Sequence, residues 1–598
     1  MRIRYFFLIV GMVWGLSSCD DVLDKRNLNT VDDTIWDNYA AATVYLNSLY
    51  AQNMPAISLG ANAGLSDEGY SSSENVTDLM WGVADETQVG IINDFSGATF
   101  ENIRRINIGI QGINRSSLSE EEKAELAGQA YFLRAWRNWQ LVRLYGGIPL
   151  VETAQDPFYD DLDLPRSTTR ESVAFIVSDL DKAVAGLPAR WELSADQGRI
   201  TSAAAAAFKG RVLLHFASPM FNPDGKQDRW QAAYTANKEA KALLDENAYG
   251  LLDDFSQMFI INPVGNPEAV LFRSYKENTE YSSGWEGTIR PPSGGGNMGA
   301  TPTWNLAQAF PMANGKPIHD PESGYDPLRY WENRDPRFYQ TIAYNGATWS
   351  MAGRDETVVW TPERFRGENN RTAGTGMLNR KASNPAIDRN NTGNTSTSWL
   401  EIRYAEVLLN LAECAVELDL QEEAVALVSQ LRQRAGISEA NNFGLGSSLS
   451  VETLMRERQV EFAFENKRYW DMRRRRMFTD DLGAHTPKMN GRKRLGLRIT
   501  GKGEWGSVVR SGDYRGASRL DTAIMLGHVD LNRPGDYETY FEVSVKNMDD
   551  LQPNGLDALI DYKELYYYFG IPVSVLTRSP AIEQTQGWLY GTFDPLKE

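Results

Sequence analysis

Apolar positions recur at helical spacing in two neighbouring stretches of the second half of the chain. Over 400–417 and again over 421–435 they fall three or four residues apart, which predicts two amphipathic helices. Ala412 and Ala424 stand where a tetratricopeptide repeat places small residues for close helix approach, although the tryptophan and proline of that consensus are missing. We expect several such pairs to stack into a curved scaffold, in which each pair buries its apolar face against the next.

Helix start and stop signals mark further helices in the first half of the chain. Ser119 and Glu122 form a capping box, and the helix that they begin is expected to run to Tyr145, before two glycines. Thr168 and Glu171 begin another helix in the same way. Three more helices are predicted at 35–50, 201–218 and 228–244. The predicted fold class is therefore mainly α, with tetratricopeptide-like helical pairs.

The pattern changes between 255 and 398. Glycine runs, Pro-Pro, Asn-Gly pairs, tryptophans and tyrosines replace the helical period, which predicts a long, irregular, loop-rich insertion with short strands. Structured loops on a rigid scaffold usually carry binding sites. We therefore expect one domain over 35–598. Its predicted parts are a helical scaffold at 35–254 and 399–478, a ligand-binding region at 255–398 and an irregular C-terminal region at 479–598.

The N-terminus has the features of an export signal. A short cationic head and an apolar stretch too short to span a membrane precede Leu-Ser-Ser-Cys19, which predicts a signal peptide over 1–18. Cys19 in this position resembles the lipobox of bacterial lipoproteins. Several acyl chains on one cysteine would anchor the protein durably, with 19–34 as a lipidated tether. The alternative is ordinary signal cleavage next to an incidental cysteine.

The charged-residue composition limits the kinds of macromolecule that the protein can bind. The chain has 61 Lys and Arg against 79 Asp and Glu, a formal charge of −18, which would repel nucleic acid and anionic membranes. We expect no nucleic-acid partner. The basic run Arg473–Arg476 follows Glu457, Glu461 and Glu465, and we interpret it as a solvated or salt-bridged helix end.

Cysteine and histidine usage predicts neither disulfides nor metal sites. Only two cysteines occur, and because Cys19 is assigned to lipid and Cys414 lies among apolar helical residues, no disulfide is expected. The four histidines lie far apart in the chain without ligand-like spacing. We therefore expect no histidine-based metal site and no cofactor.

Six segments, taken in order, resemble one family, the SusD/RagB outer-membrane lipoproteins of Bacteroidetes. They are 127–151 with its Tyr-Gly-Gly-x-Pro exit, the Asn-x-Asp-Pro-Arg turn at 333–337, 403–412, 431–437, 457–475 and the tail 571–588. The tail differs from the family pattern in having Ser579-Pro580 where Asn-Pro is usual, and Thr585-Gln586 within the last motif. The resemblance spans nearly the whole mature chain, and the shared order of the segments is specific.

The resemblance implies a function. Members of this family bind glycans, less often peptides, at the outer surface, and they close as a lid over a TonB-dependent transporter that imports the ligand. They are not enzymes. The chain is therefore expected to be a glycan-binding lipoprotein, held in the outer membrane through Cys19 and partnered by a SusC-like transporter. Asp20 and Asp21 resemble the export tag of such lipoproteins, without its most typical form, and indicate a position facing the cell exterior.

A sugar ring needs a flat aromatic platform edged by hydrogen-bonding groups. In glycan-binding members of the family, aromatic residues from early and mid-chain loops form it, and the corresponding loops here contain Trp81, Trp285 and Trp304. The candidate polar contacts are Tyr70, Asp67, Asn75, Asp78, Glu286, Arg290 and Asn305. The reserve tryptophans are Trp331, Trp349 and Trp360. The alternative is that these tryptophans are loop anchors packed on the scaffold, since large aromatic side chains are usually mostly buried.

The sequence is also compatible with two other functions. Asp67-Glu68 could supply a catalytic carboxylate to a surface glycoside hydrolase or lyase, but a glycosidase needs two carboxyls facing across a cleft. A peptide-capturing member of the same family is the other alternative, and the loop tryptophans weigh against it.

Overall fold

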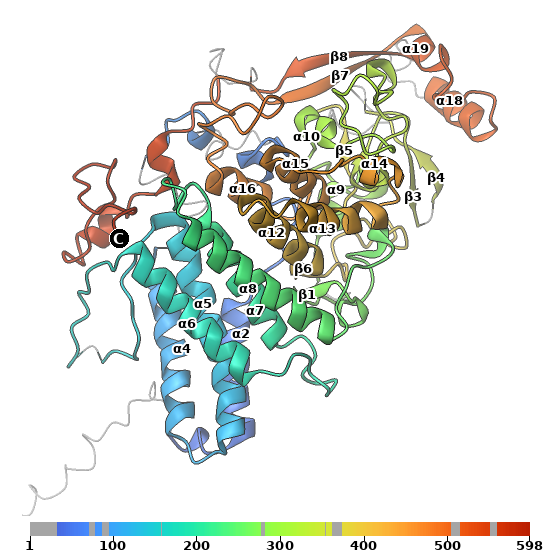
Figure 1. Cartoon of the computed structure of the whole chain (residues 1–598). Coiled ribbons are helices and arrows are strands. Elements are labelled where there is room, and N and C mark those ends of the chain that lie inside the picture. The colour runs from blue at the N-terminus through green and yellow to red at the C-terminus, as the bar shows by residue number, and fades with distance from the viewer. Residues whose placement is uncertain are drawn as a thin grey trace, which may run out of the picture.

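The computed structural model describes residues 33–70, 78–85, 95–156, 158–276, 282–352, 354–361, 374–503, 515–549 and 559–598 (Figure 1). Helices dominate these residues, and each named strand pairs with one other strand. The predicted fold class, mainly helical with a loop-rich insertion bearing short strands, is confirmed.

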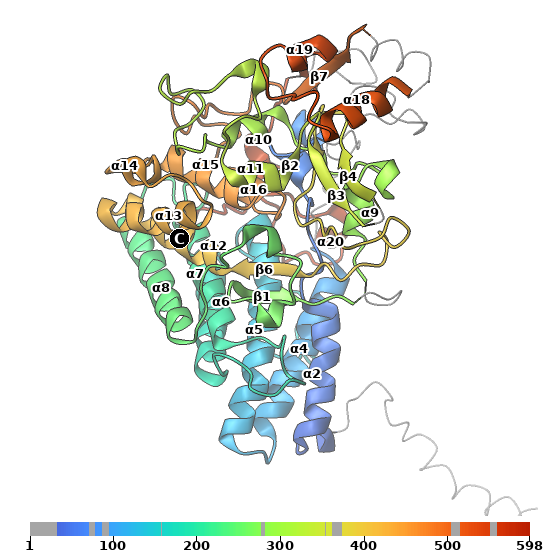
Figure 2. The ribbon, with the colours of Figure 1, turned by 90° about the vertical axis from the view of Figure 1, so that its right-hand side faces the viewer.

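The first half of the chain forms a row of packed helices, visible in Figures 1 and 2. They are α2 (Tyr39–Asn53), α4 (Gly97–Arg115), α5 (Glu120–Tyr145), α6 (Thr169–Gly186), α7 (Ser202–Ala217) and α8 (Gln227–Glu246). Each of α4, α5, α6 and α7 packs against the next helix in sequence, and α2 packs against α4 and α5. α5 therefore has neighbours on both sides, as its two apolar faces require.

Both predicted capping boxes are present. The Ser119 hydroxyl accepts a hydrogen bond from the backbone N–H of Glu122, and the Glu122 carboxylate accepts one from the backbone N–H of Ser119 at 2.9 Å. Thr168 and Glu171 form the same pair at the start of α6. These local contacts satisfy backbone donors that a helix start leaves without partners.

The predicted pair of helices consists of α12 (Tyr404–Glu417) and α13 (Gln421–Arg434), with Ala412 and Ala424 fully buried. α12 also packs against α7 and α8, so the scaffold continues across the insertion. The first predicted helix nevertheless starts four residues too early. Residues Trp399–Arg403 form strand β6, which pairs antiparallel with β1 (Ala269–Arg273). All five β6 residues are buried, the charged Glu401 and Arg403 included, and their short apolar–polar alternation joins the helical period of α12 without a break.

Short elements make up the insertion. After β1 they are α9 (Trp285–Ile289), α10 (Trp304–Ala309), α11 (Pro336–Thr341), β2 (Ile342–Ala343), β3 (Thr348–Met351), β4 (Arg354–Val358) and β5 (Leu378–Asn379). β2 pairs with β5 and β3 with β4, both antiparallel. Two hydrophobic clusters, distinct from the main scaffold core, hold these elements together. The insertion is therefore a packed region.

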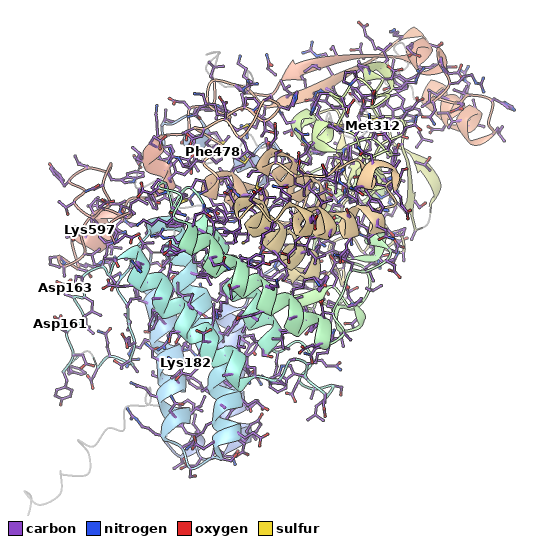
Figure 3. All side chains as sticks on the ribbon, viewed as in Figure 1. Asp161, Asp163, Lys182, Met312, Phe478 and Lys597 are labelled. Atoms are coloured by element: carbon purple, nitrogen blue, oxygen red, sulfur yellow. The ribbon has the colours of Figure 1, made fainter. Side chains whose placement is uncertain are left out.

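The C-terminal part adds helices and one two-stranded antiparallel sheet. They are α14 (Ala440–Phe443), α15 (Val451–Glu461), α16 (Arg468–Arg474), β7 (Leu495–Gly501), α18 (Arg515–Met525), α19 (Asp536–Tyr540), β8 (Phe541–Asn547) and α20 (Val573–Leu576). β7 and β8 pair in register. Phe478, labelled in Figure 3, stacks on Tyr562 with ring centroids 4.0 Å apart, and this contact attaches the C-terminal segment to the scaffold.

Arg474, Arg475 and Arg476 of the arginine run at the end of α16 are salt-bridged, as predicted, but most of the run is buried instead of solvated. Arg474 and Arg475 are buried and both donate to Glu413, at N–O distances of 2.7 Å. Only Arg476 at the end of the run is partly exposed, and it pairs with Asp480 and Glu564, each at 2.9 Å. The three upstream glutamates instead pair with cations elsewhere in the chain.

Cys414 is a free, fully buried cysteine on α12, and burial raises the pKa of its thiol. Residues 1–32, which contain the predicted signal peptide, Cys19 and most of the tether, lie outside the described residues. Among the helices that the structure describes, none is both long and apolar enough to cross a membrane.

Candidate functional site

The early and mid-chain loops that carry the candidate residues lie side by side. Gly69 and Pro302 form an isolated antiparallel bridge, and the backbone N–H of Thr303 donates to the carbonyl of Glu68 at 3.0 Å. Sequence reasoning therefore selected two loops that the fold does bring together, although they lie more than 200 residues apart.

The indoles of these loops nevertheless point inward. Trp285 is 4% exposed and donates from Nε1 to the carbonyl of Lys381 at 2.8 Å. Trp304 is 6% exposed, and its ring meets Tyr330 edge to face at 5.0 Å. Each indole belongs to a different hydrophobic cluster. The expectation that both offer exposed ring faces is wrong, because each anchors the first turn of a short helix, α9 or α10, in the core.

Three of the candidate polar residues are held in structural contacts. Glu286 and Arg290 form a fully buried ion pair on α9, and Arg290 also donates to the carbonyl of Ile387 at 2.8 Å. Burial raises the pKa of Glu286, although Arg290 opposes the shift. Asn305 accepts a hydrogen bond from the backbone N–H of Leu495 at 2.8 Å. These residues fasten loops to one another instead of facing a ligand.

The remaining candidates lie nearer the surface. Asp67 pairs with Arg468 at 2.8 Å, and the Tyr70 ring has the Arg494 guanidinium 5.1 Å from its centre. Trp81 is half-buried, and its Nε1 is a buried donor without a hydrogen-bond partner among the described residues. Asp78, also half-buried, accepts hydrogen bonds at its carbonyl from Val83 and Ala84. Asn75 lies outside the described residues.

All three reserve tryptophans are buried. Trp331 and Trp360 donate from Nε1 to Asn532 and Asp521, each at 2.6 Å, and act as loop anchors. Trp349, on β3, differs because it lines a cavity.

This cavity, here called the insertion cavity, has a volume of about 360 Å³. Its aromatic lining residues are Phe255, Phe259, Tyr339 and Trp349. The others are Ser256, Gln340, Thr348, Ser350, Arg380, Lys381, Ala382, Ser383 and Pro385. All of them belong to the predicted ligand-binding region 255–398, and the volume falls in the range typical of small-molecule sites, about 300–1,000 Å³.

Some polar groups that line the insertion cavity already have hydrogen-bond partners within the protein, and others do not. Tyr339 donates its hydroxyl to the carbonyl of Trp331 at 2.6 Å, and burial raises the pKa of this phenol. Arg380 donates to the carbonyl of Thr348 at 2.9 Å, and burial lowers the pKa of its guanidinium. In contrast, Oε1 of Gln340 is buried with no hydrogen-bond partner among the described residues. A buried acceptor without a partner favours binding of a ligand that carries a hydrogen-bond donor.

Sequence reasoning did not select Gln340, Phe255, Phe259 or Tyr339, and it named Trp349 only as a reserve. One signal pointed toward two of them, since the Asn-x-Asp-Pro-Arg turn leads directly into α11, which carries Tyr339 and Gln340. In that turn Asp335 caps α11 by accepting from the backbone N–H of Arg337 at 2.9 Å.

The possible catalytic carboxylates do not face a cleft together. Glu68 is 1% exposed, and its Oε1 accepts from the backbone N–H of Phe464 at 2.6 Å. Burial raises the pKa of Glu68 to about 8, although that hydrogen bond opposes the shift. Neither Asp67 nor Glu68 lines the insertion cavity, and the described lining residues include no carboxylate. The arrangement lacks the pair of opposed carboxyls that glycoside hydrolysis requires.

Comparison with known proteins identifies the class. A family model described as the SusD family matches residues 267–588, and one described as starch-binding associating with the outer membrane matches 21–214. The chain belongs to the SusD family, which confirms the resemblance.

Individual relatives support this membership at low sequence identity. SusD-like protein P2 of Formosa agariphila is 24% identical over 501 residues, which cover 81% of this chain and 92% of that protein. The crystal structure of a SusD-like protein from Bacteroides fragilis superposes with a TM-score of 0.70 at 24% identity, covering 93% of this chain and 99% of the other. A laminarin-binding SusD-like protein superposes with a TM-score of 0.52 at 16% identity, covering 92% and 99%. These structures share the fold.

Proposed function

We propose that this protein binds carbohydrate outside the cell and delivers it to a SusC-like TonB-dependent transporter in the outer membrane. Family membership supports the class of function. The observation that carries the proposal for this chain is the insertion cavity, which combines aromatic walls, one unsatisfied buried acceptor and no carboxylate among its described lining residues. We assign it a binding role without bond cleavage.

A sugar suits this cavity for a physical reason. Its ring has an apolar face, which packs on aromatic side chains such as Phe259, Tyr339 and Trp349. Its hydroxyls both donate and accept, so one of them donates to Oε1 of Gln340 while another accepts from Arg380 or Ser383. Trp81 stays a candidate for a further contact, because its half-buried indole retains an N–H without a partner among the described residues.

Replacing Gln340 by alanine is expected to weaken glycan binding about 3- to 10-fold, the effect of losing one hydrogen bond worth roughly 0.5–1.5 kcal/mol. Affinity gel electrophoresis in laminarin and in starch measures it as reduced retardation. Gln430→Ala, an exposed glutamine on α13, is the matched control and should be retarded like the unaltered protein. The informative gel is one that retards the unaltered protein. If both variants were retarded equally in it, the insertion cavity would not be the glycan-binding site.

Two assays distinguish glycan binding from the two alternative functions, a hydrolase or lyase and a peptide-capturing protein. Incubation of the protein with the polysaccharide that it binds should release no new reducing ends, whereas a hydrolase or lyase would release them. A peptide-capturing protein would bind a protein digest and show no retardation by any polysaccharide gel.

Anchoring depends on Cys19 in this proposal. Cys19→Ala should move the protein from the outer-membrane fraction to the soluble fraction, because the acylated residue is lost. Cys414→Ala, at the other cysteine of the chain, should leave it in the membrane fraction, since Cys414 is buried in the core. Cell fractionation followed by immunoblotting measures both, and membrane retention of Cys19→Ala would contradict the lipid anchor.

A further inference from the structure

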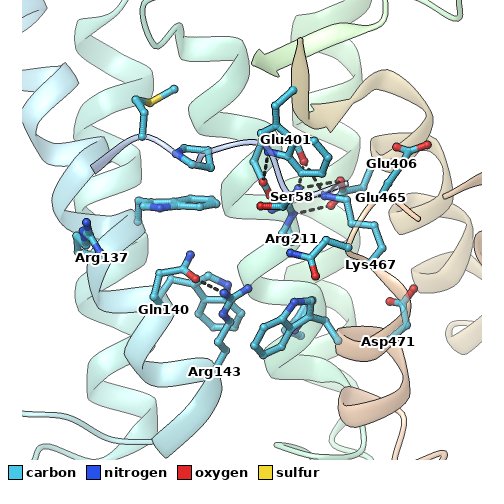
Figure 4. Close-up of a pocket in the computed structure, with 18 of the residues that line it drawn as sticks. Ser58, Arg137, Gln140, Arg143, Arg211, Glu401, Glu406, Glu465, Lys467 and Asp471 are labelled. Carbon is cyan, nitrogen blue, oxygen red and sulfur yellow. Dashed lines mark hydrogen bonds and ion pairs between the residues drawn. The ribbon is translucent and has the colours of Figure 1, made fainter. Parts of the chain in front are cut away.

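A second cavity lies in the helical scaffold (Figure 4). It has a volume of about 250 Å³, and its walls come from the segment after α2, from α5, α7 and β6, and from the start of α16. Four indoles line it, those of Trp136, Trp139, Trp399 and Trp470. A dry cavity of about 150 Å³ accommodates benzene, so this space accommodates a six-membered ring with substituents. We call it the scaffold cavity.

The carboxylates of the scaffold cavity already have cationic partners. Arg211 pairs with Glu401 and Glu406, each at 2.6 Å, on one side of the cavity (Figure 4). Asp471 pairs with Arg458 at 2.9 Å. Glu465 pairs with Arg403 at 2.8 Å. Burial works to raise the pKa of Glu406, but Arg211 and Lys467 outweigh it and hold that pKa at about 2. Each of these carboxylates already has a cationic partner in the protein, so the cavity does not require a cation or a basic ligand.

Two hydrogen-bond donors of the cavity are, by contrast, without partners among the described residues. The Trp470 side chain is 8% exposed, and its Nε1 is buried and unsatisfied. Nε2 of Gln140 is also buried and unsatisfied, while Oε1 of the same amide accepts from Arg143. The Arg143 guanidinium lies 3.7 Å from the centre of the Trp470 ring. An indole N–H and an amide N–H therefore sit beside a fixed positive charge, and leaving such donors unpaired is costly.

We propose that the scaffold cavity binds a small ligand through a carboxylate, which accepts from Nε1 of Trp470 and Nε2 of Gln140 next to Arg143. A carboxylate has only acceptor atoms and two oxygens for the two donors. Hydrogen bonds to an ionised acceptor are about twice as strong as neutral ones. The Trp136 and Trp139 indoles add flat apolar walls, which suit the body of a uronic acid better than a simple aliphatic acid.

Isothermal titration calorimetry on the mature protein tests the site with three probes: sodium glucuronate, glucose and sodium propionate. Glucuronate is expected to bind at least 10-fold more tightly than glucose, which has the same ring without the carboxylate. If propionate bound as tightly as glucuronate, the carboxylate would be the recognised group and the sugar ring would add nothing to the affinity. Equal affinities for glucuronate and glucose, or no heat with any probe, would overturn the proposal and leave a cavity that holds only water.

Two substitutions test whether glucuronate binds in the scaffold cavity. Gln140→Glu keeps the shape of the side chain but replaces its donor by a negative charge, and Trp470→Phe keeps an aromatic ring without the N–H. Each is expected to weaken glucuronate binding at least 10-fold at an unchanged melting temperature. Gln430→Ala, at the exposed glutamine on α13, should not change it. Unchanged affinity in Gln140→Glu would overturn the assignment even if Trp470→Phe fails to fold.

Discussion

Replacing Arg403 by methionine is expected to lower the free energy of unfolding by about 3–5 kcal/mol, the cost of removing one partner from a buried ion pair. Arg403 is 1% exposed and donates to Glu268, to Glu461 at 3.1 Å and to Glu465 at 2.8 Å. Methionine fills a similar volume without charge. The buried carboxylates would then lose a cation in a region from which water is excluded.

The same cluster connects the scaffold to the insertion cavity. Glu465 also pairs with Lys381 at 2.9 Å, and Lys381 lines that cavity. Glu461 pairs with Arg434 and, at 2.9 Å, with Arg337 of the Asn-x-Asp-Pro-Arg turn. We therefore expect Arg403→Met to weaken glycan retention as well as stability.

Chemical denaturation measures the loss of stability. The control is Arg170→Met on α6, where the arginine is exposed and its pair with Glu598 at 3.0 Å is expected to contribute less than about 1 kcal/mol. Adding Glu465→Gln to Arg403→Met should recover part of the loss, because one uncompensated carboxylate becomes neutral. If Arg403→Met and Arg170→Met were equally stable, the cluster would not have the role assigned to it.

Glu68→Gln is expected to make the protein more stable at pH 8 and to have little effect near pH 5. The folded-state pKa of Glu68 is about 8, raised from an ordinary value of 4.5 chiefly by burial. Between these values the folded state holds a proton that the unfolded state has released. Stability from this group is therefore fully present below the unfolded pKa and is lost as the pH rises through the folded pKa. At 1.36 kcal/mol per pKa unit, the full effect is on the order of 5 kcal/mol.

Glutamine suits this test because it stays neutral and its Oε1 can still accept from the backbone N–H of Phe464. Thermal unfolding of both proteins from pH 5 to pH 9 measures the effect as a melting-temperature difference that grows with pH. Glu122→Gln provides a control of opposite sign, because hydrogen bonds from Ser119 lower the pKa of Glu122 and its carboxylate stabilises the fold at neutral pH. A Glu68→Gln difference that stayed constant across this range would show that Glu68 is ionised in the folded protein.

Much of the fold could be predicted because its signals are local. The capping boxes at Ser119 and Thr168 and the apolar period of α12 and α13 each depend on residues within one or two helical turns. The order of the family motifs adds information that spans the chain. The sequence does not separate strand β6 from α12, because its five residues lead directly into the helix and their short alternation merges with the helical period that follows.

The candidate site could be predicted only as a region. The insertion was recognised from its glycines, prolines and aromatic residues, and it does contain a cavity with aromatic walls. The direction of each indole depends on partners distant in sequence. The partner of Trp285, the carbonyl of Lys381, lies 96 residues away. Gln340 shows nothing unusual in sequence, because its distinguishing property is a buried oxygen left without a donor.

By itself the sequence determined the helical class, the loop-rich insertion, the family and the expectation of a lipid anchor at Cys19, because each is encoded in neighbouring residues or in the order of motifs. The tertiary structure decided which aromatic residues face a cavity, which arginines lie in the core, and that burial raises the pKa of Glu68. These properties arise from burial and from contacts between distant segments. Removal of a side chain from water, the physical cause of all three, is set only when the whole chain has packed.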